Sequence, residues 1–158
     1  MSVRVGVCGA AGRMGRTIIE VCKDTEGVEF TAAIEYNESS LLGVDAGEVA
    51  GIGKTGVLIT DNILSIADQV DVMIDFTFAA SVNANIKKCV AANCKMVIGT
   101  TGLSKIDHEQ IALASKKIAI VFAPNMSIGI NLCLKLLEMA ALVIGDNADI
   151  EIIEAHHR

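Results

Sequence analysis

Residues 3–15 read Val-Arg-Val-Gly-Val-Cys-Gly-Ala-Ala-Gly-Arg-Met-Gly, and this stretch decides the fold class. Residues 3–8 alternate valine with other residues, which predicts a strand, and residues 13–23 have the period of a helix. One face of that helix carries Met14, Ile18, Ile19 and Cys22. The glycine-rich turn between strand and helix is typical of an α/β protein with a parallel sheet.

Further short apolar runs alternate with helical patterns along the chain. Strands are expected at 28–34, 72–76, 96–98 and 118–122, and helices at 79–92 and 104–115. Right-handed crossovers between such strands give a doubly wound parallel sheet. Residues 37–60 have no clear period and carry five glycines, which predicts a long irregular loop with one short strand.

The spacing of the glycines suggests a ligand. Gly9, Gly12 and Gly15 allow a tight turn, close approach of a pyrophosphate, and close packing of helix on strand. The N-terminus of the helix adds free N–H groups, and Arg13 adds a cation. Ala11 occupies the usual position of the second glycine, a small departure. We therefore expect a Rossmann-like dinucleotide-binding sheet, although a turn with packing value only would leave the same pattern.

Glu35 lies twenty residues beyond Gly15, at the end of the second predicted strand. A carboxylate there accepts both ribose hydroxyls of an adenosine and repels a 2′-phosphate. The next residue is Tyr36, so no guanidinium follows to bind that phosphate. Glu35 followed by Tyr36 therefore favours NADH over NADPH. Alternatively, Glu35 is only a solvated acid at the end of a strand.

Two later loops follow apolar strands and precede helices, at 97–102 and 122–127. Ligands of open parallel sheets lie beyond the carboxyl ends of the strands, so these loops should meet the nicotinamide half. Ordinary turn and cap chemistry is the alternative. Residues 75–77 are a weaker candidate at an equivalent strand end.

Composition excludes several classes. A net charge of −6 without a Lys/Arg cluster argues against nucleic acid and anionic membranes. Five scattered cysteines without CxxC spacing indicate reduced thiols in a cytoplasmic protein, and no metal site is expected. Residues 53–55 resemble the end of a P-loop but lack the required glycine and a following helix. The longest uncharged run, 118–134, is interrupted by polar residues and too short for a transmembrane helix.

Residues 127–144 predict a helix that is apolar nearly all round and must be buried or lie at a junction. Residues 149–154 predict a strand, followed by His156, His157 and Arg158. These side chains are suited to supply a proton and bind carboxylates, or they form a solvated end. Because the chain stops at this cluster, we expect a truncated protein: a cofactor domain over 1–126 and, over 127–158, the hinge helix and first strand of a second α+β domain.

Six segments are spread over nearly the whole chain: VGVCGAAGRMGR, SSLLGVDAGEVAGIGKTGV, DVMIDFT, VIGTTG, FAPNMSIGIN and IEIIEAHHR. Together, and in this order, they resemble the dihydrodipicolinate reductase family of lysine and diaminopimelate biosynthesis. The resemblance implies a homotetramer whose N-terminal part binds NADH or NADPH, and hydride transfer to a cyclic, unsaturated dicarboxylate. It makes His156 the proton donor and His157 a substrate-binding residue.

The resemblance also assigns the cofactor contacts by position. They are Gly9, Ala10, Ala11, Gly12, Arg13, Met14, Glu35, Tyr36, Gly99, Thr100, Thr101, Ala123, Pro124, Asn125 and Met126. Tyr36 stands where many members have Arg, and Pro124 replaces a small residue. The family's catalytic Lys and its DAPSGTA-like loop do not follow the histidines, so we expect this chain to bind NADH with little turnover. Two other interpretations remain open: a non-catalytic nicotinamide-nucleotide sensing domain, and a related dehydrogenase with another substrate.

Overall fold

The structure is a computed structural model that describes residues 2–153. The chain divides into two compact units after Pro124, and each is described by itself. This division lies two residues before the boundary expected from the sequence. The roles expected for the two parts stay predictions.

Six strands form one parallel sheet in the first unit, in the order β3-β2-β1-β4-β5-β6. They are β1 (Val3–Cys8), β2 (Val28–Ile34), β3 (Ile59–Thr60), β4 (Val72–Asp75), β5 (Lys95–Ile98) and β6 (Ile120–Phe122). The strand order reverses between β1 and β4, and ligands of such sheets bind at the carboxyl ends beside this switch point. The Rossmann-like doubly wound sheet predicted from the sequence is confirmed.

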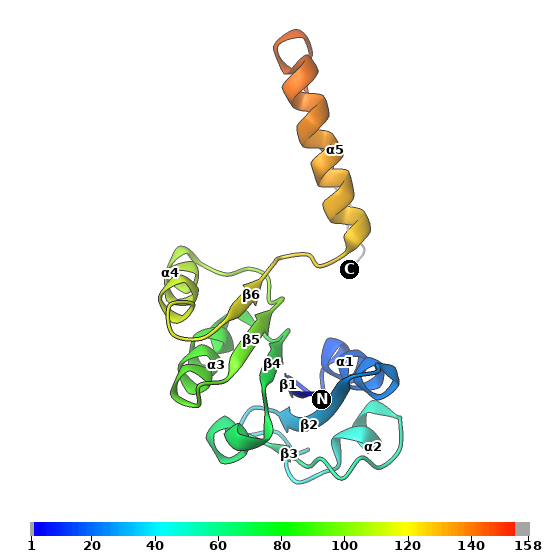
Figure 1. Cartoon of the computed structure of the whole chain (residues 1–158), viewed down its shortest axis with the longest axis vertical. Helices are drawn as coiled ribbons and strands as arrows, with labels where there is room; N and C mark the ends of the chain where they lie inside the picture. The colour runs from blue at the N-terminus through cyan, green and yellow to red at the C-terminus, as the bar shows by residue number, and fades with distance from the viewer. Residues whose placement is uncertain (1, 154–158) are drawn as a thin grey trace. The chain divides into compact units, whose positions relative to one another are not determined.

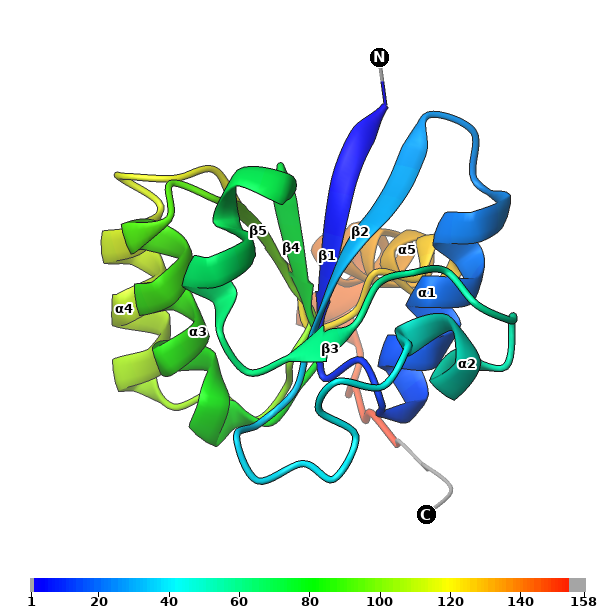
Figure 2. The same ribbon diagram turned by 90° about the horizontal axis from the view of Figure 1, so that it is seen from below.

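Helices cover both faces of the sheet (Figures 1 and 2). On one face lie α1 (Arg13–Asp24) and α2 (Ala46–Ala50); on the other lie the 3-10 helix η1 (Ile63–Gln69), α3 (Ala79–Ala91) and α4 (Lys105–Ala114). Alternation along β1 explains the two cores, because Val7 packs toward α1 and Cys8 toward α3. Each fully buried large aliphatic side chain, such as Ile19, contributes about 1.5–3 kcal/mol.

The helix α2 lies inside the segment expected to be an irregular loop. The buried carboxylate of Asp45 caps it, accepting hydrogen bonds from the N–H groups of Gly47, Glu48, Thr55 and Gly56 and from the Thr55 hydroxyl. Burial opposes the charged form, but these hydrogen bonds outweigh it and lower the pKa of Asp45 to about 2. The hydrogen bonds to Asp45, rather than an apolar period, specify this helix. The apolar pattern of the sequence therefore did not predict the helix.

The second unit contains α5 (Ile128–Ile144), followed by a 3-10 turn, η2 (Gly145–Asn147). Ser127 caps α5, since its hydroxyl accepts the N–H of Ile130 at 3.4 Å. Within the described residues, Ile128–Asn147 is long and apolar enough to span a membrane by length and composition. The expectation that no segment is long enough was therefore wrong. A core helix of a soluble protein passes the same test, so composition alone does not assign this helix to a membrane.

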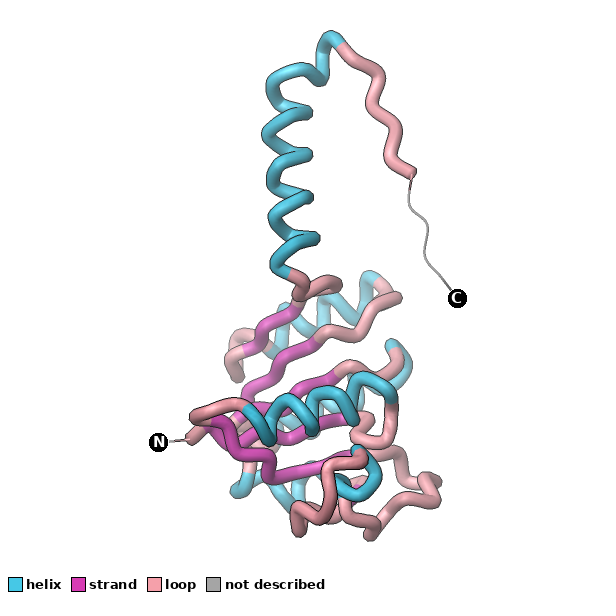
Figure 3. The backbone as a smooth tube through the Cα atoms, turned by 90° about the vertical axis from the view of Figure 1, so that its right-hand side faces the viewer, coloured by secondary structure: helices cyan, strands magenta, loops and turns pink. Residues whose placement is uncertain are grey.

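The strand expected at 149–154 is absent from the described part, residues 149–153, which Figure 3 draws as loop after the last helical turn. An apolar extended segment becomes a strand only when a neighbouring strand supplies its hydrogen bonds. No described segment pairs with it. Glu154 lies outside the described residues.

Candidate functional site

The glycine turn joins the end of β1 to the start of α1. Gly9 has a φ of +69°, and the Gly12 N–H closes the turn on its carbonyl at 2.9 Å. A Cβ on Gly15 would collide with the carbonyl oxygen of Gly9, so only glycine lets α1 begin this close to the strand. No side chain caps the helix at Gly12. The first N–H groups of α1 are therefore available to an anion, with the positive end of the helix dipole behind them.

Glu35 is held against this turn. It directly follows β2, is half-buried, and its Oε1 accepts the backbone N–H of Ala11 at 2.8 Å. Within residues 2–153, no hydrogen bond reaches Oε2. The carboxylate is thus oriented by the glycine turn through one oxygen and presents the other to the space beyond. The link joins two features that the sequence analysis identified separately.

A cleft of about 880 Å³ opens at the carboxyl ends of β1 and β2. It brings together most of the predicted contacts of the turn and of the second strand: Gly9, Ala11, Gly12, Arg13, Met14, Glu35 and Tyr36. Ala10 does not line the cleft, because it is fully buried in the core under α1. Tyr36 is 65 % exposed, and no Arg or Lys lies next to it in the sequence.

The opposite wall was predicted only in part. Phe76 and Thr77, from the weaker candidate 75–77, line the cleft, whereas the residues that follow them were not predicted. Phe78, the residue before α3, is 84 % exposed and lines the cleft. Lys88, ten residues further along α3, also lines it and donates to the carbonyl of Asp61 at 3.4 Å. The position of Phe78 just after a strand end could have revealed it. No sequence pattern marks Lys88, because whether its side chain reaches the cleft depends on how α3 packs against the sheet.

The predicted loop after β5 lies at the same sheet edge but does not line this cleft. The N–H of Gly99 donates to the Asp75 carbonyl at 2.9 Å, and the ring of Phe76 occupies the space where a Gly99 side chain would be. Thr100 is buried, with its hydroxyl 3.2 Å from Oδ1 of Asp75. Thr101 is exposed. These residues adjoin β4 rather than the glycine turn.

The remaining predicted residues fall at or beyond the end of the first unit. Ala123 follows β6, and its N–H donates to the Ile98 carbonyl at 3.2 Å; Pro124 is exposed. Asn125 belongs to the second unit, where its Oδ1 accepts the N–H of Ser127 at 2.8 Å. Met126 lies in that unit too. His156 and His157, the predicted proton donor and substrate-binding residue, lie outside the described residues.

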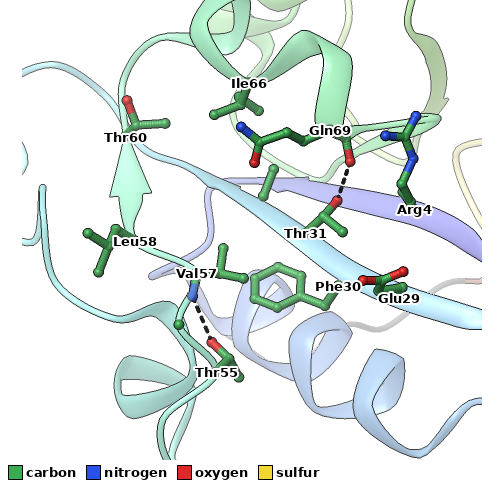
Figure 4. A pocket seen from close by; sticks show the side chains of 12 residues that line it. Arg4, Glu29, Phe30, Thr31, Thr55, Val57, Leu58, Thr60, Ile66 and Gln69 are labelled. Carbon is green, nitrogen blue, oxygen red and sulfur yellow. Dashed lines mark hydrogen bonds between the residues drawn. The ribbon is translucent and has the colours of Figure 1, made fainter.

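A second hollow, of about 630 Å³, lies along the outer edge of β2 (Figure 4). The Thr31 hydroxyl donates to the Gln69 carbonyl at 2.7 Å across it, and Phe30, Leu58 and Ile66 line it. None of the predicted site residues lies there. The glycine turn and Glu35 identify the first cleft as the better candidate.

Comparison with known proteins gives the family of this chain. The model of the family described as "Dihydrodipicolinate reductase, N-terminus" matches residues 3–126. The dipicolinate-bound dihydrodipicolinate reductase from Paenisporosarcina sp. TG-14 is 26 % identical, with a TM-score of 0.71 over 89 % of this chain and 54 % of that one. The chain thus spans about half the length of that structure.

Two more distant structures share the fold. The WlbA dehydrogenase from Bordetella pertussis, solved with NADH and UDP-GlcNAcA, has a TM-score of 0.66 and 15 % identity over 89 % of this chain and 43 % of its own. GenD2 from gentamicin A biosynthesis, solved with NAD, has a TM-score of 0.63 and 19 % identity over 78 % and 35 %. The match over residues 3–126 places this chain in the dihydrodipicolinate reductase family, in its N-terminal part.

Proposed function

We propose that this chain binds a reduced nicotinamide dinucleotide in the glycine-turn cleft, with NADH favoured over NADPH. The observation that carries the proposal is the Glu35 carboxylate, held by the Ala11 N–H at 2.8 Å and directed into a cleft of about 880 Å³. We further propose that the protein reduces 4-hydroxy-tetrahydrodipicolinate to tetrahydrodipicolinate in lysine and diaminopimelate biosynthesis.

The residues present fit such a cofactor. Gly9 and Gly12 line the cleft without side chains, so a diphosphate could meet the backbone there, and Gly15 lets α1 begin close to the strand. The uncapped N–H groups of α1 suit its negative charge, and Arg13 lines the same cleft. The second oxygen of Glu35 is suited to accept a ribose hydroxyl. A 2′-phosphate at that position would be repelled by the carboxylate.

The chemistry divides between cofactor and protein. Bound nicotinamide supplies a hydride, and the chain's residues bind and orient. The glycine turn and Glu35 hold the adenosine and diphosphate half, and the loops at Gly99–Thr101 and Ala123–Met126 are proposed to meet the nicotinamide half. On the family resemblance, His156 donates the proton and His157 binds a substrate carboxylate. The dipicolinate found in the Paenisporosarcina enzyme supports a cyclic dicarboxylate as substrate.

The assembly and location of the protein are also proposals. The family resemblance supports a cytoplasmic homotetramer that binds neither nucleic acid nor membrane. The net charge of −6 supports the first of these exclusions, because phosphate backbones are bound by basic surfaces.

Titration calorimetry of the chain with NADH and NADPH tests the binding proposal. We expect saturable heat with both and a lower Kd for NADH. Absence of heat with both nucleotides would overturn it. An assay of NADH oxidation tests the proposed reaction. The protein that contains this chain is mixed with NADH and 4-hydroxy-tetrahydrodipicolinate, and the loss of NADH is followed. Binding without any such oxidation would favour the sensing domain or a dehydrogenase with another substrate.

A further inference from the structure

Asp75 is a fully buried carboxylate at the carboxyl end of β4 that the proposed function does not use. Its side chain has 0 % exposure and, within residues 2–153, forms no ion pair. A buried carboxylate is costly unless hydrogen bonds replace its hydration. Asp75 lies next to the switch point of the sheet, between the glycine turn after β1 and the loop after β5. A dinucleotide that contacts both of these loops would cross the end of β4.

Four hydrogen bonds replace that hydration, and they come from three separate segments. Oδ1 accepts the Thr77 N–H at 3.0 Å, the Thr77 hydroxyl at 2.6 Å and the Thr100 hydroxyl at 3.2 Å. Oδ2 accepts the side-chain amide of Asn85 at 2.9 Å. The side chain of Asp75 therefore connects the loop after β4, the helix α3 and the loop after β5 through hydrogen bonds.

Two of these segments border the glycine-turn cleft. Thr77 and Asn85 line it, and a Cβ on Gly9 would lie 2.9 Å from the Thr77 methyl group, so Thr77 packs against the turn itself. Thr100 is buried outside the cleft, in the loop proposed to meet nicotinamide. Asp75 is the acceptor that all three share.

We propose that Asp75 is a positioning residue: by accepting the Thr100 hydroxyl it fixes the Gly99–Thr101 loop relative to the glycine turn. The inference rests on the proposed nucleotide binding and adds to it the group that aligns the nicotinamide loop. Asp75 acts through Thr77 and Thr100 and need not touch the cofactor.

The test compares NADH with ADP-ribose, which lacks nicotinamide, using calorimetry and thermal unfolding. Thr100→Val removes the hydroxyl and keeps the volume, whereas Thr100→Ser keeps the hydroxyl. We expect Thr100→Val to weaken NADH about tenfold, as for one hydrogen bond to a charged acceptor, while ADP-ribose changes less than about twofold. Thr100→Ser should retain NADH binding near that of the unaltered chain.

Asp75→Asn is the second variant, and Asp45→Asn is the matched control. Both remove a buried carboxylate that accepts several hydrogen bonds, but the partners of Asp45 lie around α2. We expect Asp75→Asn to weaken NADH more than ADP-ribose, and Asp45→Asn to lower the Tm while keeping the ratio of the two Kd values. If Thr100→Val does not fold, Asp75→Asn decides.

The failures are distinguishable. Equal weakening of NADH and ADP-ribose in Thr100→Val and Asp75→Asn, or no weakening of either ligand, would overturn the positioning role. So would equal affinity of the unaltered chain for the two ligands, because no nicotinamide contact would then exist to align. Failure of the unaltered chain to bind either ligand would instead overturn the proposed function.

Discussion

Removal of the Glu35 charge should shift the preference of the chain from NADH toward NADPH. Glu35→Gln keeps an oxygen that can accept the Ala11 N–H, now 2.8 Å from Oε1, so the glycine turn should keep its shape. What changes is the charge that faces the ribose. Glu35→Ala removes both oxygens and leaves the Ala11 N–H to water.

The size of the effect follows from two opposing interactions. Hydrogen bonds to charged groups contribute about 1.5–3 kcal/mol and neutral ones about 0.5–1.5 kcal/mol, so Glu35→Gln should cost NADH about 1–2 kcal/mol, roughly tenfold in Kd. Two unit charges 4 Å apart repel by about 1 kcal/mol in water, and a 2′-phosphate carries nearly two charges. Loss of that repulsion should offset the lost hydrogen bonds for NADPH.

We therefore expect the Kd for NADH to rise about tenfold in Glu35→Gln while that for NADPH stays equal or falls, and a larger rise for NADH in Glu35→Ala. The fluorescence of the reduced nicotinamide reports both titrations. Glu38→Gln is the matched control, because Glu38 is an exposed acid three residues along that does not line the cleft. Equal changes for both nucleotides in Glu35→Gln would refute the ribose role.

Three further predictions concern the turn, the opposite wall and the acid limit of stability. Gly15→Ala should lower the Tm and abolish NADH binding, because its Cβ would meet the Gly9 carbonyl; thermal unfolding with and without NADH checks this, and Gly145→Ala, which meets nothing within 4 Å, should change neither. Phe78→Ala should weaken ADP-ribose by about 1 kcal/mol, the value of one stacked aromatic face, with an unchanged Tm; unaltered ADP-ribose affinity would show that the exposed ring lies outside the base site. The pKa of Asp45 is lowered to about 2 in the folded chain, against about 3.9 in the unfolded chain. Its charge therefore stabilises the fold above about pH 3.9, and this contribution is lost as the pH falls toward 2. Urea unfolding should show the free energy of unfolding decreasing over this window, and Asp45→Asn should make the decrease smaller.

The strands were predictable where short apolar runs are buried on both faces of the sheet. The bounds Val3–Cys8 and Val28–Ile34 match the prediction, because these strands lie at the centre of the sheet and their apolar residues pack against helices. The last strand begins two residues later than expected, since Ile118 is buried in the core as part of the loop before β6. An apolar residue indicates burial, but buried residues also occur in loops, so an apolar run can be longer than the strand it contains.

The short helix α2 and the segment 149–153 show what a local pattern leaves out. A five-residue helix held by Asp45 has no apolar period to detect. Residues 149–153 have the composition of a strand but no described neighbour to pair with. The helix depends on hydrogen bonds that Asp45 accepts from residues 2 to 11 positions further along the chain, and residues 149–153 have no partner strand within the described structure.

The site divides in the same way. The spacing of Gly9, Gly12, Gly15 and Glu35 along the β1–α1–β2 unit predicted that they share one site, and the structure places all four around one cleft. Phe78 and the four-donor network of Asp75 were not predicted, because they depend on α3 and the loop after β5 converging on one strand end. The contact between Ala11 and Glu35 spans 24 positions and became visible only in the fold.

The proposed function requires that the amides of the glycine turn bind a dinucleotide. Heteronuclear NMR of the isotope-labelled chain, titrated with NADH, tests it most directly, because each backbone amide reports separately. We predict that the largest shift changes fall on Gly9–Gly15 and on Glu35 and Tyr36, and that they saturate. Changes confined to the hollow beside Thr31 and Leu58, or no changes at saturating nucleotide, would contradict the account.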